Sequence, residues 1–262
     1  MRCRAGTCGW SYEDWKGVFY PPGCKDELAH YCTLFDCVEI DSTWYRIPSR
    51  RTVESWERRT PEGFTFCPKM PGEITHEAML VDCEDLLEQF IGAISLLGGK
   101  LGPIVVQLAP KFHADQFAIL ERFLSSLPDG LRYTVEFRHK SWVDEPRAIK
   151  LLQQLEMGLV MAHHPWYPRI MQVTCELAYI RLMGPRKGYP DLSRIHRPRD
   201  EALHSWAEVL QGLEGKVQQA FVFVNNHFEG HAPASVRRLL ELLGQGGPSS
   251  VELQPRLDIE DD

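Results

Sequence analysis

Residues 132–142 read Arg132-Tyr133-Thr134-Val135-Glu136-Phe137-Arg138-His139-Lys140-Ser141-Trp142. The first half of this stretch is rich in Tyr, Thr, Val and Phe, a composition typical of a β-strand. Because a strand sends alternate side chains to opposite faces, Val135 and Phe137 share an apolar face and Glu136 and Arg138 share the other. Burial of a carboxylate and a guanidinium is costly unless the two groups are paired or used. A polar site shared with neighbouring strands would account for both side chains.

Short, apolar, strand-like runs alternate with helix-period segments along the chain, as in βαβ units built on a parallel sheet. The strand-like runs are residues 3–10, 37–43, 64–70, 101–110, 132–139, 158–163, 177–184 and 220–226. Helices are expected at residues 26–35, 51–59, 82–97, 115–126, 145–155, 200–213 and 233–243. An irregular segment containing Pro165 and Pro168 separates the sixth and seventh runs. Eight alternations in one chain favour a single α/β domain, a (β/α)8 TIM-type barrel over residues 1–244. Residues 245–262 are expected to form a flexible, acidic C-terminal tail.

Composition limits the class of protein. The chain has 262 residues, of which 44% are hydrophobic, and a formal charge of −7, which argues against a broadly basic surface for nucleic acid. Its eight cysteines form no C-x-x-C pair, which favours free thiols in a reducing compartment. No signal-peptide core is present, and no apolar run approaches the roughly 20 residues of a membrane span. We therefore expect a cytoplasmic protein without membrane partners; the oligomeric state is not determined by the sequence.

Strand parity places polar side chains near the carboxyl ends of six of the predicted strands. They are Glu39, Lys69, Gln107, Glu136 with Arg138, Arg181, and one of the pair Asn225-Asn226. Active sites of TIM barrels form at this end, so we expect a substrate pocket at the barrel mouth. The alternative is a buried salt-bridge lattice that pairs Glu39 with Lys69 and Glu136 with Arg181. Buried pairs often add little net stability, which favours the pocket.

The residue types in this ring suit the binding of an anion. Lys69, Arg138 and Arg181 can clamp a phosphate or carboxylate, and Gln107, His139 and Asn225 can orient it. Glu39 and Glu136 are candidate acid–base catalysts, and two carboxylates could equally support glycoside cleavage. Trp10 and Tyr45, in the loops after the first two strands, could stack on bases or sugars. The histidines show no spacing such as H-E-x-x-H, so no metal ligands are assigned, although a divalent metal cofactor stays open.

Several motifs together resemble one known family. The matching stretches are Gly6-Thr7-Cys8-Gly9-Trp10-Ser11-Tyr12, Val38-Glu39-Ile40-Asp41-Ser42-Thr43-Trp44-Tyr45, Phe66-Cys67-Pro68-Lys69, Ile74-Thr75-His76, Gln107-Leu108-Ala109-Pro110, Val135-Glu136-Phe137-Arg138-His139 and Asn225-Asn226. They resemble the domain of unknown function 72 family, also called the YecE-like proteins. The resemblance implies a TIM-type barrel and implies no established reaction. The chain departs from the family pattern at Asp41 and Trp44, where members often carry Asn and Phe, at Met183, where many carry His, and at 163–165, where an Asp is common.

The leading hypothesis is an enzyme that acts on an anionic, phosphate-bearing substrate, phosphodiesters and nucleic acid included. A carbohydrate-active hydrolase that uses the two glutamates is the second hypothesis. A non-catalytic barrel that binds a metabolite or nucleic acid is the third. Fold-level analogy alone does not separate them, because one fold hosts many functions.

Overall fold

The computed structural model describes residues 1–185 and 188–245. The part of the chain that it describes contains the strands β1 Arg2–Thr7, β2 Cys37–Ile40, β3 Thr65–Pro68, β4 Ile104–Gln107, β5 Tyr133–Glu136, β6 Gly158–His163, β7 Leu177–Leu182 and β8 Gln219–Val224. Each strand lies within or beside the run that predicted it. The chain is an α/β protein with a TIM-type barrel at its centre, as expected. From residue 246 onward, the tail predicted at 245–262 lies outside the described residues.

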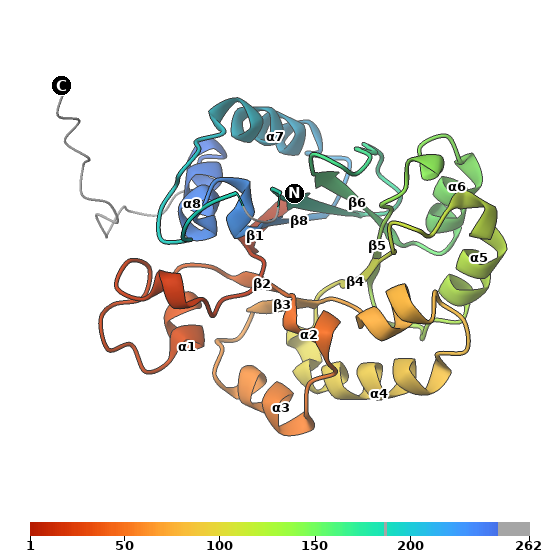
Figure 1. The fold of residues 1–262 in the computed structure, drawn as a ribbon, viewed down its shortest axis with the longest axis horizontal. Helices are drawn as coiled ribbons and strands as arrows, with labels where there is room; N and C mark the ends of the chain where they lie inside the picture. Colours follow the sequence, from red (N-terminus) through yellow and green to blue (C-terminus); the bar gives the residue numbers. More distant parts are fainter. Residues whose placement is uncertain (186–187, 246–262) are drawn as a thin grey trace.

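The strands follow one another around the barrel in chain order, with helices on the outside (Figure 1). One parallel ladder runs β1-β8-β7-β6-β5-β4 and a second pairs β2 with β3. Isolated bridges join the two ladders, Cys8 with Glu39 between β1 and β2, and Lys69 with Val105 between β3 and β4. Each bridge has a backbone hydrogen bond, from Gly9 to Glu39 at 2.8 Å and from Met70 to Val105 at 2.9 Å. A further bridge, Phe66 with Leu101, also joins β3 to the residues just before β4, so isolated bridges hold the barrel wall at these two junctions.

The outer helices are α1 Glu27–Tyr31, α2 Ser42–Tyr45, α3 Arg50–Arg58, α4 Glu84–Ile94, α5 Phe117–Ser125, α6 Pro146–Gln154, α7 Asp200–Gly212 and α8 Ala232–Leu242. Their starts follow local sequence signals: Asp26 caps α1 through the Ala29 amide at 2.9 Å, Ser49 caps α3, and Pro146 opens α6. Short helical turns occupy the loops, namely η1 Glu13–Trp15, η2 Glu73–Glu77, η3 Ser95–Lys100, η4 Ala114–Gln116, η5 Lys140–Trp142 and η6 Asn226–Phe228, and η2 is a π-helix.

The connection between β6 and β7 contains no helix, since none of residues 164–176 is helical. This confirms the irregular segment expected there. Pro165 and Pro168 lack an amide hydrogen and disfavour helical conformation in the residue before them. The sixth unit of the barrel is therefore a strand followed by a loop.

The two faces of the strands carry different cores. On β5, Tyr133, Val135 and Phe137 pack among residues of α4, α5 and α6 outside the barrel. Inside, a smaller apolar cluster that includes Val105, Tyr179, Phe221 and Phe223 fills the barrel. The parity predicted from the sequence is thus observed, and the inward positions nearer the carboxyl ends are left to the polar side chains.

Two further features of the described residues bear on the sequence expectations. No helix among them combines the length and the apolar character that crossing a membrane requires. All eight cysteines are free thiols, and Cys8, Cys37, Cys67 and Cys83 are buried.

Candidate functional site at the barrel mouth

Arg181, near the end of β7, lies at the centre of a buried hydrogen-bond network. Its Nε and Nη2 donate to Oε1 of Glu39 at 3.1 and 2.7 Å, and its Nη1 donates to Gln107 at 3.0 Å and to Glu136. The side chain is 0% exposed. Burial would lower the pKa of Arg181, but Glu136 and Glu39 raise it well above its ordinary value. Arg181 therefore stays charged and ties β2, β4 and β5 to β7.

The carboxylates of this network have further partners. Oε2 of Glu39 accepts a hydrogen bond from the Tyr179 hydroxyl at 2.8 Å, and Oε1 of Glu136 accepts one from Nε of Arg138 at 2.6 Å. Burial would raise the pKa of Glu136, but Arg181 and Arg138 hold it well below its ordinary value. Glu136 is thus an anion at neutral pH.

Lys69 pairs with Asp41, at 3.0 Å between Nζ and Oδ1, and not with Glu39 as the lattice alternative supposed. The register explains the difference, because Glu39 lies opposite Cys67 and Ile40 opposite Pro68, which brings Asp41 level with Lys69. The other expected pair, Glu136 with Arg181, is present. Burial would raise the pKa of Asp41, but Lys69 and Arg181 lower it below its ordinary value.

The cluster has two tiers. Glu39, Glu136 and Arg181 form a sealed floor, whereas the side chains of Lys69, Arg138 and Asp41 are 9%, 14% and 26% exposed. The three carboxylates balance the three cations, so the cluster as a whole is neutral. Only the upper tier meets solvent, and its two cations are the charges that an incoming anion would reach.

Each upper-tier cation rests on an aromatic ring. Nζ of Lys69 lies 5.7 Å from the ring centre of Trp44, and the guanidinium carbon of Arg138 lies 4.6 Å from that of Tyr167. Arg138 uses Nε for Glu136 and Nη2 for Gln107, and no described residue accepts a hydrogen bond from its Nη1. Cation–π contacts and ion pairs together hold both side chains in place before any ligand arrives.

Two histidines border the upper tier. His76 lies in η2, after β3, with its ring 5.1 Å from that of Trp44, and His164 directly follows β6. Burial, with Arg138 as the next cause, lowers the pKa of each imidazole to about 4. Both rings are therefore neutral at neutral pH.

The structure does not bring four of the residues predicted for the site into this cluster. Trp10 packs edge-on against Trp56 and Phe66, because Gly9 has φ of 79° and turns the chain out of strand alternation. His139 follows the inward-pointing Arg138, so it faces outward, where its ring stacks on that of His113 at 3.7 Å.

The other two of these four follow β2 and β8, Tyr45 at the end of α2 and Asn225 directly before η6. Tyr45 is 65% exposed and meets Trp44 edge-on at 4.9 Å. Asn225 uses its side-chain oxygen to accept the His227 amide at 2.9 Å, which caps η6. The side-chain oxygen of Asn225 therefore stabilises the turn that begins η6.

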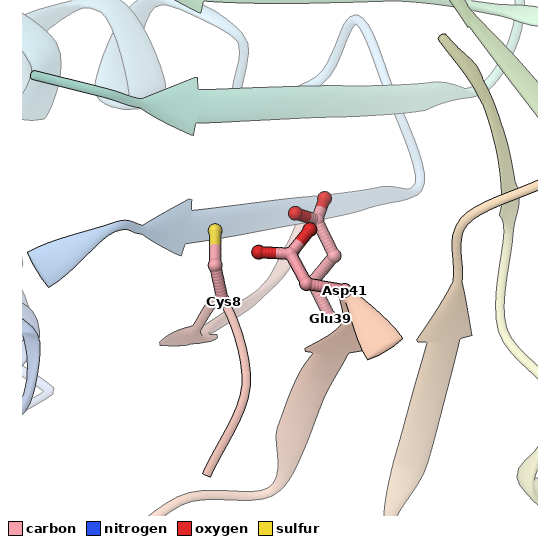
Figure 2. Close-up of side chains that lie close together, drawn as sticks. All are labelled: Cys8, Glu39 and Asp41. Carbon is pink, nitrogen blue, oxygen red and sulfur yellow. The ribbon is translucent and has the colours of Figure 1, made fainter. Parts of the chain in front are cut away.

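Cys8, Glu39 and Asp41 approach one another closely enough to hold a metal ion, with one ligand atom from each within 4.8 Å of the others (Figure 2). Their present partners oppose this role. Arg181 and Tyr179 occupy the oxygens of Glu39, and Lys69 lies beside Asp41. Burial and the nearby carboxylates raise the pKa of the Cys8 thiol well above its ordinary value, so a metal ion would have to displace its proton. A divalent cation would have to displace two cations that already neutralise these acids.

A groove with a volume of about 670 Å³ lies elsewhere, between α4 and α5. Its walls include Leu80, Leu87, Ile91, Phe123 and Pro128. It contains none of the residues predicted for the site, and its charged lining residues are Asp82, Glu84, Glu88 and Arg122, of which three are acidic.

Sequence reasoning did not assign several side chains that the structure adds to the mouth. Asp41 and Tyr179 share the inward parity of Glu39 and Arg181, so strand alternation could have identified both. Trp44, His76, His164 and Tyr167 lie in loops and short helical turns. No periodicity governs side-chain direction there, so only the fold places them.

A family model described as "Protein of unknown function DUF72" matches residues 4–257. UPF0759 protein YecE of Escherichia coli K12 is 35% identical over 134 residues, which is 51% of this chain and 47% of that protein. The chain thus spans about half the length of this curated relative. UPF0759 protein YunF of Bacillus subtilis is 26% identical over 267 residues, covering 91% of this chain and 93% of that protein.

Solved structures of DUF72 family proteins have the same fold as this chain. A DUF72 family protein from Thermotoga maritima superposes with a TM-score of 0.79 at 29% identity, covering 93% of this chain and 100% of that one. A DUF72 family protein from Enterococcus faecalis superposes with a TM-score of 0.78 at 22% identity, covering 97% and 98% of the two chains.

Proposed function

Because this chain belongs to the DUF72 family, whose name assigns no reaction, its function has to be argued from its site, and we propose that it hydrolyses a phosphate ester at the barrel mouth. One observation carries the proposal. Lys69 and Arg138 are held on aromatic rings above the sealed floor of the cluster, and both retain access to solvent. Preorganised cations of this kind suit a phosphate, whose transfer depends mainly on positioning and charge stabilisation.

The geometry divides the roles within the predicted ring. Lys69 and Nη1 of Arg138 contact the phosphate. Arg181 binds Glu39 and Glu136 and keeps Glu136 ionised, and Glu136 with Gln107 orients Arg138. In this proposal the two glutamates build the anion site, and they do not exchange protons with the substrate.

Glycoside cleavage receives less support from the same geometry. It needs two carboxyl groups that flank a sugar, one of them protonated. Glu39 and Glu136 are 0% and 2% exposed, and both bind Arg181. Neither carboxylate is placed to meet a solvent-borne sugar.

The first test is calorimetric titration of the purified protein with inorganic phosphate. Replacing Arg138 by Met or Lys69 by Met removes a charged hydrogen bond worth about 1.5–3 kcal/mol. We therefore expect roughly 10- to 150-fold weaker binding of phosphate to either variant. Arg147→Met is the matched control, because Arg147, like Arg138, pairs with a glutamate and stacks on an aromatic ring, Phe117, but lies on the surface.

Failure of the wild-type protein to bind phosphate would overturn the anion site, as would equal losses in the Arg138 and Arg147 variants. Turnover is then measured on aryl phosphate mono- and diesters and on aryl glycosides. Hydrolysis of glycosides alone would favour the carbohydrate hypothesis. Phosphate binding without turnover of any ester would leave a binding barrel, and would refute hydrolysis.

A further inference from the structure

His76 is held in one tautomer by a short chain of hydrogen bonds. The hydroxyl of Thr75, a fully buried residue, donates to the Pro71 carbonyl at 3.1 Å, and its oxygen lies 2.9 Å from Nδ1 of His76. A hydroxyl has a single hydrogen, which the Pro71 carbonyl already takes. The Thr75 oxygen therefore accepts, and Nδ1 of His76 carries the proton. In the neutral ring, Nε2 of His76 is then a free acceptor.

His164 is held in the opposite tautomer. Its Nδ1 accepts the backbone amide of Trp166 at 3.2 Å, so the proton of the neutral ring resides on Nε2. The ring stacks on Tyr167 at 4.1 Å, and Tyr167 in turn supports Arg138. Nε2 of His164 is thus a donor on the ring that lies next to the Arg138 platform.

Both rings lie beside the same charged cluster, because His76 packs against Trp44 and His164 against Tyr167, the two rings that support Lys69 and Arg138. The charged and titratable groups that act on His76 are Arg138, Lys69, Glu136 and Lys111. Those that act on His164 are Arg138, Glu136, Arg181 and His163. Among the described residues, neither Nε2 atom has a hydrogen-bond partner, so both are available to a ligand at the mouth.

We propose that His76 and His164 form a pair with opposite roles, in which Nε2 of His76 accepts a proton from the attacking water and Nε2–H of His164 donates a hydrogen bond to an oxygen of the substrate. This inference rests on the proposed phosphate-ester hydrolysis, because it names the groups that would act on the bound ester. A neutral histidine that serves as a hydrogen-bond donor has precedent in enzyme mechanism.

The proton inventory of this step balances. The oxygen of water bonds to phosphorus while the bond from phosphorus to the ester oxygen breaks. His76 takes the proton that the water loses and later releases it to solvent, and the departing oxygen, which has kept the electron pair, takes a proton from solvent water. His164 gives up no proton; its hydrogen bond stabilises the negative charge on the phosphoryl oxygens.

A bound phosphate would also tune the base. Arg138 and Lys69 disfavour a second positive charge nearby, which contributes to the low pKa of His76. An anion between them offsets these charges and raises the pKa of His76 toward neutrality, where a general base is most effective.

The test is ¹⁵N nuclear magnetic resonance of the histidine side chains in the whole protein, with and without inorganic phosphate. We expect the Nδ1–H tautomer for His76 and the Nε2–H tautomer for His164, and an upward pKa shift of both rings when phosphate is added. The opposite tautomer at either ring would overturn the inference, while phosphate binding measured by calorimetry would still support the proposed function.

Thr75→Val supplies a second measurement, since it removes the acceptor for Nδ1 of His76 and keeps the side-chain shape. In this variant the tautomer population of His76 should shift toward the Nε2–H form. Thr60→Val is the matched control, because Thr60 is also a buried threonine bonded to a carbonyl four residues earlier, Trp56, at 2.9 Å, but has no histidine partner. An unchanged His76 tautomer in a folded Thr75→Val protein would refute the hydrogen-bond chain. If Thr75→Val does not fold, the wild-type spectra alone decide.

Discussion

Arg181 donates hydrogen bonds to side chains of three other strands, Glu39 on β2, Gln107 on β4 and Glu136 on β5. Taking such charges out of water costs free energy, and their attraction repays the cost only when every partner is present. The network therefore adds less net stability than its number of contacts suggests. The network does, however, make the protein's stability sensitive to the loss of any one of its members, because the remaining charges stay buried without a partner.

Replacing Arg181 by Met leaves Glu39 and Glu136 buried without their shared cation. We expect the free energy of unfolding to fall by about 3–5 kcal/mol, measured by urea denaturation. Arg147→Met, which breaks a surface pair with Glu145, should leave the free energy of unfolding nearly unchanged. Equal losses in the two variants would show that the buried network has no special sensitivity.

At the scale of elements, the end of β7 packs directly on the turn that follows β8. Gly184 makes this contact possible, because a Cβ atom there would lie 1.6 Å from the carbonyl oxygen of His227 in η6. The obstacle is backbone, which cannot rotate away as a long side chain can. The loops after β7 and β8 can therefore pack this closely only because residue 184 has no Cβ atom.

Gly184→Ala should force these two loops apart and lower the free energy of unfolding by about 1–3 kcal/mol or more. Gly212→Ala is the control for the same substitution. Gly212 ends α7 with open space around it, and alanine favours a helix over glycine by about 0.5–1 kcal/mol. Thermal unfolding of both variants checks the contrast. A Gly184→Ala protein as stable as Gly212→Ala would contradict the close approach of the loops.

At the scale of the whole molecule, the protein keeps two neutral imidazoles inside a charged barrel mouth. The pKa of His76 and that of His164 are lowered from 6.5 to about 4 by burial and by Arg138. Below pH 6.5 the unfolded chain takes up protons at these rings, and the folded chain does not until the pH approaches 4. The stability that these rings contribute is therefore present above pH 6.5 and lost as the pH falls toward 4.

We expect the free energy of unfolding to decrease as the pH is lowered from 6.5 to about 4, and the slope to flatten when His76 and His164 are both replaced by Asn. The pKa of Glu136 and that of Asp41 are held below 4.5 and 3.8 by their cationic partners, so their contribution is lost only at still lower pH. His204→Asn, at an exposed site on α7, is the control. An unchanged slope in the double variant would contradict the assignment.

Much of the architecture could be predicted because it depends on local pattern. Alternating apolar residues located the strands and their inward faces, and Pro165 and Pro168 indicated the connection without a helix. The inward direction of Glu39, Gln107, Glu136 and Arg181 followed from the same alternation. None of these inferences requires knowledge of which strands are neighbours.

The sequence by itself therefore determined the barrel, the phase of its strands and the meeting of charged groups at one end. The tertiary structure alone decided which charged side chains pair with each other and which of them are exposed to solvent. Asp41 rather than Glu39 meets Lys69 because of the register between β2 and β3, and Arg181 is sealed because side chains of three other strands converge on it. His76 and His164 lie in loops whose direction depends on tertiary contacts. Alternation acts between adjacent residues, whereas register, burial and loop direction are set by contacts between residues far apart in the chain.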